Sequence, residues 1–343
     1  MSLYKKFASN KAMKDLIKPK EDPEYISTGV IPLNILFSGM VRGGIPKGKM
    51  CMFAAPSQSA KTTTALYTLR NAQKSGMECI IIDAENRFDF KWAESLGIDI
   101  SEDKLLVVRT GNIIEIGQTI QVLKEGKNRS ERENVFVLVD SWGTIVSPTT
   151  LDKAEKGSDT KNMSEAIWKN NLANLITESG MTYFVLNHVY DNVGGYGEML
   201  LIGGGRRIYF NADCCVMCTG KTKDKATDGD VEGYILKANA HKGTKAIPKL
   251  SMEYRLKFKG GLDPWYGILN DALECKCVVR EGNYYIRPDV DDTKWKLKDI
   301  YCNDFWIPIF KKTNFEEYLD SKYSAVTEDA EEDKIDISDL LEM

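Results

Sequence analysis

The chain has 343 residues, of which 43% are hydrophobic and 28% are charged. This composition allows a sizeable buried core and excludes a chain that is disordered as a whole. No apolar run reaches the length of about 18 residues that is typical of a membrane span, so we expect no membrane partner. The N-terminal stretch has no apolar segment of the secretory type, and the eight cysteines follow no framework spacing. We therefore expect a cytoplasmic protein with reduced thiols.

The net charge of −4 is unevenly distributed along the chain. Residues 327–343 hold eight acidic residues and one lysine, a net charge of −7, so the preceding residues sum to about +3. A mildly basic body with an acidic tail is compatible with a polyanionic partner. It is equally compatible with a solvated tail that only aids solubility.

From about residue 25 onward, strand-like and helix-like segments alternate. Apolar residues at consecutive positions are typical of strands buried on both faces, and we expect such strands at residues 49–55, 78–84, 134–140, 181–187 and 214–220. Helical patterns lie between them, near residues 61–75, 90–96, 113–126 and 164–179. Alternating βα units predict an α/β fold with a mainly parallel central sheet flanked by helices.

The rest of the chain predicts smaller attachments to this core. Beyond residue 230 the pattern alternates and becomes more polar, as antiparallel strands require, and the aromatic-rich segment after residue 263 predicts a small α+β lobe. We therefore divide the chain into an N-terminal arm or helix at residues 1–24, a core at 25–263, a C-terminal lobe at 264–326 and an acidic tail at 327–343.

One segment has the context that a phosphate-binding loop requires. Residues 55–62, with the sequence APSQSAKT, follow a predicted strand and open a predicted helix. Backbone N–H groups at such a helix start can bind phosphate oxygens, Lys61 can bridge the β- and γ-phosphates, and the Thr62 hydroxyl can ligate Mg²⁺. Alanine stands at both usual glycine positions, Ala55 and Ala60, and alanine tolerates positive φ poorly. Taken alone, the segment also fits an ordinary strand-to-helix turn.

Acidic residues at the ends of two strands strengthen the case for a nucleotide site. Asp140 ends one apolar run, where a carboxylate can reach Mg²⁺ or its water shell, and Asp83 ends another. Glu85 lies two residues past that second strand and can point over the edge of the sheet, where it could orient and deprotonate an attacking water. The alternative for any one of these acids is a helix cap or a surface ion pair.

Several segments of the sequence match a known family. They lie at residues 26–29, 55–62, 79–100, 185–188, 202–213, 258–273 and 303–310. Together they resemble the RecA recombinases, and in detail the T4-type phage recombinases of the UvsX family. The resemblance covers about residues 25–320. It implies a RecA-like P-loop NTPase fold, with residues 25–263 as the ATPase core and with ATP and Mg²⁺ as cofactors. It also implies the bacterial host cytoplasm as the location if the gene is phage-encoded.

The resemblance also implies roles for individual residues. Glu85 matches the catalytic glutamate and Asp140 the Walker B aspartate, which would reach Mg²⁺ through water while Thr62 ligates it. Asp89 and Trp92 match an acid and an aromatic that lie against adenine, although Trp92 could instead anchor its helix in the core. His188 could donate a hydrogen bond to a γ-phosphate oxygen. The nucleotide-binding residues implied are Ser57, Gln58, Ser59, Ala60, Lys61, Thr62, Thr63, Asp89, Trp92 and Asp140.

Two loops match the DNA-binding loops of the family. Residues 147–164 and 190–207 supply lysines, glycines, tyrosines and arginines that suit a single-stranded partner. The candidates are Lys153, Lys156, Lys161, Tyr190, Gly194, Gly195, Tyr196, Arg206 and Arg207. Lys242 and Lys245 match two cations that reach the γ-phosphate of the neighbouring subunit, although Thr244 aligns better than Lys245 with the second position. Both lysines could instead be exposed turn charges.

These features together predict a DNA-dependent ATPase that polymerises on single-stranded DNA and carries out homologous pairing and strand exchange in recombination, repair and replication. The expected partners are single- and double-stranded DNA, further copies of the chain in a helical filament, a recombination mediator and a single-strand-binding protein. Two alternatives remain open. The alanines of the loop would suit a non-hydrolysing DNA-binding mediator, and the fold would also suit a ring-forming helicase or clock-type ATPase.

Overall fold

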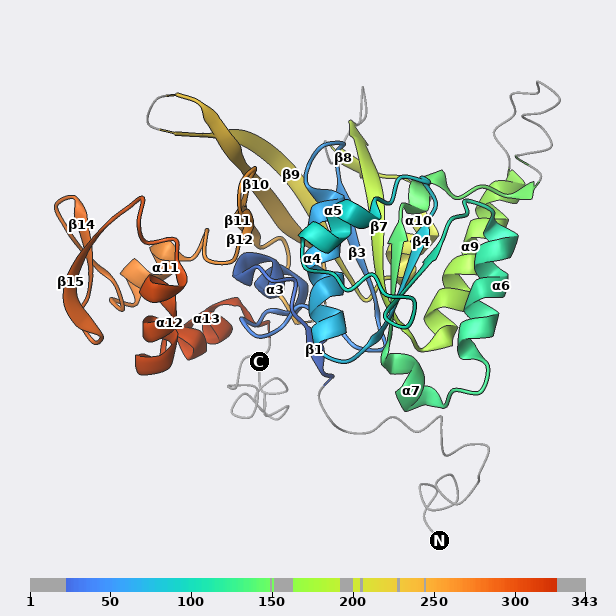
Figure 1. Cartoon of the computed structure of the whole chain (residues 1–343), viewed down its shortest axis with the longest axis horizontal. Coiled ribbons are helices and arrows are strands. Elements are labelled where there is room, and N and C mark those ends of the chain that lie inside the picture. Colours follow the sequence, from blue (N-terminus) through green and yellow to red (C-terminus); the bar gives the residue numbers. More distant parts are fainter. Residues whose placement is uncertain are drawn as a thin grey trace, which may run out of the picture.

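The computed structural model describes residues 23–325, apart from residues 149, 151–162, 192–199, 204–205, 227–228 and 244. One ten-stranded sheet runs through the molecule in the order β12-β11-β10-β9-β3-β7-β6-β4-β5, and β8 pairs with β7 at one end (Figure 1). Its strands are β3 (Met50–Ala55), β4 (Glu78–Asp83), β5 (Leu105–Val108), β6 (Val135–Asp140), β7 (Thr182–Asp191), β8 (Leu200–Ile202), β9 (Cys214–Lys225), β10 (Val231–Lys242), β11 (Ser251–Lys257) and β12 (Gly261–Asp263).

The middle and one side of this sheet are parallel, and the other side is an antiparallel meander. Strands β3, β4, β5, β6 and β7 pair in parallel, and β9 also pairs in parallel with β3. From β9 to β12 each strand pairs antiparallel with the next. The carboxyl ends of the parallel strands therefore meet at one edge of the sheet, as the predicted α/β fold requires.

The sheet separates two hydrophobic clusters, which explains why its strands are apolar at successive positions. In β3, Cys51 and Phe53 belong to one cluster, whereas Met50 and Met52 belong to the other. Successive strand side chains point to opposite faces, so a strand covered on both faces must be apolar throughout. The predicted burial of these runs on both faces is confirmed.

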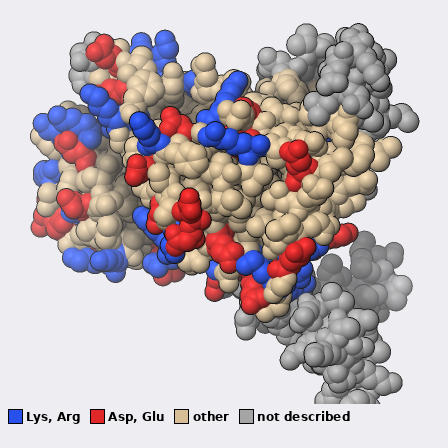
Figure 2. Space-filling model, turned by 45° about the vertical axis from the view of Figure 1, so that its right-hand side comes forward, with Lys and Arg blue, Asp and Glu red and all other residues tan. Residues whose placement is uncertain are grey.

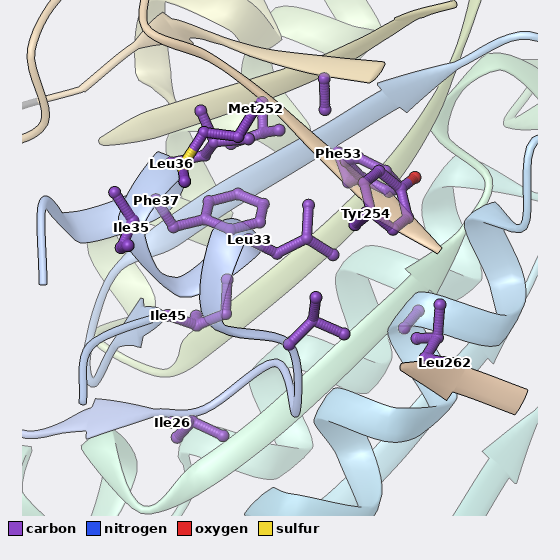
Figure 3. Packing of buried hydrophobic residues seen from close by; sticks show 14 of the residues in the cluster. Ile26, Leu33, Ile35, Leu36, Phe37, Ile45, Phe53, Met252, Tyr254 and Leu262 are labelled. Carbon is purple, nitrogen blue, oxygen red and sulfur yellow. The ribbon is translucent and has the colours of Figure 1, made fainter. Parts of the chain in front are cut away.

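Helices cover both faces of the sheet (Figure 1). Apolar residues of α3 (Ile31–Ser38), α4 (Lys61–Lys74) and α5 (Phe90–Ser95) join the cluster on one face. Those of α6 (Ile113–Lys124), α9 (Met163–Ser179) and α10 (Arg206–Asn211) join the cluster on the other. Figure 3 shows Leu33 and Phe37 of α3 on one side of Phe53 of β3 and Tyr254 of β11, which lie next to each other. The rings of Phe37 and Phe53 are 6.5 Å apart.

The aromatic C-terminal segment forms further helices and a small antiparallel sheet beside the core (Figure 1). Its elements are α11 (Leu269–Glu274), β13 (Val279–Glu281), β14 (Tyr284–Arg287), β15 (Asp291–Lys296), α12 (Asn303–Lys312) and α13 (Phe315–Tyr323). Buried residues of α12 and α13, among them Trp306 and Phe315, belong to the same cluster as α3. The backbone N–H of Val41 donates to Asp320 of α13, which ties this segment to the start of the core.

The strands and helices expected in the core are present, with bounds that differ from the expected ones by a few residues. Several elements were not predicted. They are the short elements β1 (Tyr25–Ile26), β2 (Ile45–Pro46) and α7 (Arg129–Glu133), the 3₁₀ turn η1 (Trp142–Thr144), and also α3, β5 and α10. Within the described residues, no helix is long and apolar enough to cross a membrane.

Candidate nucleotide-binding site

The loop between β3 and α4 bends as a P-loop although it contains no glycine. Gln58 and Ala60 have φ of 59° and 55°, in the left-handed region that residues with a side chain seldom adopt. Ala60 is the residue immediately before α4. Ala55, by contrast, is the buried last residue of β3. The expected strain at a glycine position thus falls on Ala60 and not on Ala55, and Gln58 carries the second left-handed turn.

Two side chains at the start of α4 point into the site. Lys61 is only 8% exposed, and the hydroxyl of Thr62 donates a 2.9 Å hydrogen bond to Oδ2 of Asp140. Because β6 ends at Asp140, the strand-end carboxylate and the first turn of α4 meet at the carboxyl edge of the sheet. The structure therefore brings together the lysine, hydroxyl and Walker B carboxylate expected from the sequence.

The catalytic carboxylate expected from the sequence lies beside this group. Oε1 of Glu85 accepts a 2.7 Å hydrogen bond from the Ser141 hydroxyl and lies 3.0 Å from Nε2 of His188. Nδ1 of the same imidazole lies 3.5 Å from Nζ of Lys61. Arg87 also approaches the Glu85 carboxylate, at 3.5 Å. The side chains of Lys61, His188 and Glu85 thus form one continuous row of polar contacts.

Burial and neighbouring charges shift the pKa values of these groups. Burial lowers the pKa of the Lys61 ammonium, although Asp140 and Glu85 oppose the shift. Burial also raises the pKa of Asp140, although the hydrogen bond from Thr62 opposes this shift. At Glu85 burial raises the pKa, but the hydrogen bonds from Ser141 and His188 outweigh it, so the net pKa is lowered. Such perturbed groups on one edge of a sheet are typical of functional sites.

The chemistry of these residues fits a magnesium-bound nucleoside triphosphate. Mg²⁺ prefers hard oxygen ligands and usually binds through one or two protein groups, phosphates and water. Thr62 and Asp140 offer two such oxygens, already 2.9 Å apart. Among the residues that the structure describes, no three His, Cys, Asp or Glu side chains converge as a self-sufficient metal site. A metal held partly by a nucleotide is therefore the kind that this pair suits.

The residues expected to face adenine lie on α5. Asp89 accepts a hydrogen bond of 3.1 Å from the backbone N–H of Trp92 and so caps the start of this helix. The Trp92 side chain is 39% exposed. The alternative that Trp92 anchors its helix in the core is therefore wrong. Asp83 is also a structural residue, because its carboxylate accepts from the backbone N–H groups of Arg87 and Phe88.

The end of β7 connects the site to the second predicted DNA loop. Asn187 is buried, and its side-chain amide donates to the carbonyl of Gly203, while the Gly203 N–H donates to the carbonyl of His188. A Cβ on Gly203 would lie 1.9 Å from the Tyr190 hydroxyl, so the close approach of that ring requires glycine here. Tyr190 itself is 53% exposed. Within this loop, Gly194, Gly195 and Tyr196 lie outside the described residues.

For the other predicted DNA-binding residues, the structure describes no side-chain contacts. Lys153, Lys156 and Lys161 of the first loop lie outside the described residues, and Arg206 and Arg207 begin α10 with side chains that are not described. The base of the first loop is described. There the Glu165 carboxylate accepts from the backbone N–H and hydroxyl of Ser147 and from the hydroxyl of Thr150.

The two lysines expected to act across a subunit interface lie away from this row of contacts. Nζ of Lys242, at the end of β10, donates to the carbonyls of Tyr209, Phe210 and Ala212 at 3.3, 2.7 and 2.6 Å. Within one chain, Lys242 therefore caps the carboxyl end of α10 and is not simply an exposed turn charge. The carbonyl of Lys245 accepts from the N–H of Ala325, which joins this turn to the chain after α13.

Two further residues at the site have no clear signal in the sequence. Ser141 is buried directly after Asp140 and binds Glu85. Lys221 lies on β9, and its Nζ donates to the carbonyl of Gln58 at 2.8 Å. A hydroxyl next to the strand-end acid is a weak indication for Ser141. The residues Lys221 and Gln58 are 163 positions apart, so no local pattern connects them.

Fold and site together define an α/β protein with a P-loop between β3 and α4. Comparison with known proteins agrees, since a family model described as the RecA N-terminal domain matches residues 1–263. The chain is 26% identical over 328 residues to the recombination and repair protein of Enterobacteria phage T4. The aligned region covers 91% of this chain and 82% of the phage protein. It is 28% identical over 289 residues to Protein RecA of Aquifex pyrophilus, covering 83% and 79% of the two chains.

The chain belongs to the RecA family. The similarity to the T4 protein confirms the resemblance to T4-type phage recombinases that the sequence motifs indicate.

Proposed function

We propose that this protein is a DNA-dependent ATPase and recombinase that forms helical filaments on single-stranded DNA and carries out homologous pairing and strand exchange. The observation that carries the proposal is the convergence of Lys61, Thr62, Glu85, Asp140 and His188 at the carboxyl edge of the sheet. Membership of the RecA family and the printed name of the phage T4 relative support the same function.

Each of these side chains has a distinct task in ATP hydrolysis. Lys61 and the N–H groups around it would bind the phosphates, and Thr62 and Asp140 would hold Mg²⁺. When bound, Mg²⁺ would neutralise part of the charge on the phosphates of ATP. Glu85 orients a water and accepts its proton, a task that requires an ionised carboxylate, and the lowered pKa of Glu85 keeps it ionised. Trp92, which is exposed on α5, stacks on the adenine ring.

DNA binding is coupled to this site through β7. His188 contacts both Lys61 and Glu85, and its carbonyl accepts from Gly203 at the base of the second DNA loop. Binding or loss of the γ-phosphate therefore acts on the loop through His188. Figure 2 shows Lys and Arg side chains in the upper part of the face in view, interspersed with Asp and Glu.

Filament assembly places Lys242 of one subunit at the nucleotide of the next, where a cation stabilises the charge that develops in phosphoryl transfer. Within one chain its ammonium is bound by carbonyls of α10, so reaching a neighbour requires release of that helix end. Head-to-tail contacts that do not close give a helical filament.

The C-terminal lobe guides duplex DNA, and a mediator and a single-strand-binding protein assist loading.

The proposal is tested by steady-state ATP turnover with and without single-stranded DNA, and by strand exchange. DNA should stimulate turnover by the native chain, and Glu85→Gln should lower kcat by a factor of about 10² to 10⁴ while DNA binding persists. Lys61→Ala should abolish exchange. Glu94→Gln, an exposed glutamate on α5, is the matched control.

Two outcomes would contradict the proposal. Turnover that is neither stimulated by DNA nor changed by Glu85→Gln would favour a non-hydrolysing mediator. Closed rings, instead of helical filaments, in electron micrographs of the complex with ATP and DNA would favour a ring-forming ATPase.

A further inference from the structure

A lysine outside the P-loop binds the backbone of the loop at a residue whose backbone conformation is unfavourable. Nζ of Lys221 donates a 2.8 Å hydrogen bond to the carbonyl of Gln58, whose φ of 59° is left-handed. The two residues meet because β9 pairs in parallel with β3, in a register that joins Ala54 to Met217. Four residues beyond this pair the two chains reach Gln58 and Lys221.

A second contact fixes the position of the ammonium group. Nζ of Lys221 lies 3.7 Å from the centroid of the Tyr234 ring, within the range of a cation–π interaction. Phe258 packs edge-on against Tyr234, with ring centroids 5.2 Å apart. Although Lys221 is exposed, its charged end is thus held between an aromatic ring and a backbone carbonyl. A lysine held in this way differs from a solvated surface charge.

The hydrogen bond has a consequence for the loop because the peptide bond is planar. In a trans peptide the C=O of one residue and the N–H of the next point in opposite directions. Lys221 holds the Gln58 carbonyl toward β9, so the N–H of Ser59 points to the other side of the chain. Ser59 is 3% exposed. Backbone N–H groups turned into such a loop are the groups that bind phosphate.

The loop needs such an anchor because it has no glycine. Glycine adopts positive φ without steric penalty, whereas Gln58 and Ala60 both adopt it against the preference of their side chains. A backbone in this state returns easily to a commoner conformation unless its surroundings hold it. We propose that Lys221 is a positioning residue, which holds the Gln58–Ser59 peptide in the phosphate-binding orientation and replaces the conformational freedom of a glycine. The inference rests on the proposed nucleotide site.

The test is nucleotide affinity in the absence of DNA, measured by titration calorimetry with ADP and with a non-hydrolysable ATP analogue, both with Mg²⁺. Lys221→Met keeps the aliphatic stem over Tyr234 but removes the donor. It should weaken nucleotide binding about five- to tenfold without lowering Tm. Lys221→Arg keeps a donor and should recover much of the affinity. Lys225→Met, at an exposed position further along β9, is the matched control and should bind like the native chain.

A second background separates positioning of the loop from direct binding of the nucleotide. Gln58→Gly removes the side chain that opposes positive φ, so in this background Lys221→Met should change the affinity less than twofold. An equal loss in both backgrounds would overturn the inference, as would native affinity in the Lys221→Met single variant. If the native chain binds no nucleotide at all, the proposed function fails instead, so the two failures are distinguishable.

Discussion

Nε2 of His188 lies 3.0 Å from Oε1 of Glu85, and Nδ1 of the same ring lies 3.5 Å from Nζ of Lys61. One side chain at the end of β7 therefore touches both the P-loop lysine and the carboxylate proposed to activate water. A ring nitrogen that donates to Glu85 leaves the other as an acceptor toward Lys61 in the neutral imidazole. In that tautomer His188 links the two groups through hydrogen bonds.

The first prediction concerns this link. His188→Ala should lower the stimulation of ATP turnover by single-stranded DNA about tenfold, because Glu85 loses a positioning contact and the DNA loop loses its connection to the site. Nucleotide affinity without DNA should change much less. His188→Gln should retain most of the stimulation, because an amide can also donate to Glu85 and accept from Lys61. The measurement is kcat with and without DNA. An alanine variant with native stimulation would show that β7 does not carry the coupling.

The second prediction concerns the Lys242 cap on α10. Lys242→Met removes a charged donor from three carbonyls at the helix end, and hydrogen bonds to charged groups contribute about 1.5–3 kcal/mol each at most. Amide hydrogen exchange in residues 206–213 should become at least tenfold faster in the DNA-free chain. Lys237→Met, at an exposed position on the same strand, should leave this exchange unchanged. Equal protection in the two variants would mean that packing of α10, and not the lysine, holds the helix end.

The strands of the core were predictable because a strand buried on both faces is apolar at consecutive positions. The run at β6, from Val135 to Val139, is apolar at every position because its neighbours β4 and β7 lie on either side and helices cover both faces. Asp140 at its end was also predictable, since a carboxylate that closes such a run lies at the edge where ligands bind.

Short or atypical elements escaped prediction for physical reasons. Strand β5 has only four residues at the edge of the sheet, and Leu106 within it is 49% exposed, so its pattern is neither fully apolar nor cleanly alternating. Helix α3 is buried on nearly every side and therefore has no polar face to give a helical period. The hydrogen bond between Lys221 and Gln58 depends on strand register, which the sequence of neither segment specifies alone.

The third prediction concerns pH and the base of the first proposed DNA loop. Burial raises the pKa of Glu165, but hydrogen bonds from Ser147 and Thr150 outweigh it, so the net pKa is lowered. A lowered carboxyl pKa contributes stability that is present above the unfolded value of about 4.3 and is lost as pH falls through the folded value. Because the group is partly exposed, the contribution should be only about 1 kcal/mol.

Urea unfolding of the native chain and of Glu165→Gln, compared at several pH values, tests this sign. The native chain should be the more stable of the two between about pH 8 and pH 5, and the difference should shrink below about pH 4.3. Glu178→Gln, at an exposed position on the same helix, should show no such dependence. A difference that grows toward low pH would mean that the Glu165 carboxylate is destabilising in the folded chain.

The fourth prediction concerns the junction between the core and the C-terminal lobe. The Arg255 guanidinium pairs with Asp263 and lies 4.2 Å from the ring centroid of Tyr301, and both members of the ion pair are 8% exposed. Arg255→Met should cost about 3–5 kcal/mol in the free energy of unfolding, because it leaves a buried carboxylate without its counter-charge, although the backbone N–H of Trp265 still donates to it. Adding Asp263→Asn should recover part of that loss, since the neutral amide needs no counter-charge. Urea unfolding followed by tryptophan fluorescence measures both. A loss below about 0.5 kcal/mol, as at an ordinary surface site, would mean that apolar packing around Trp306 and Phe315 holds the lobe without this pair.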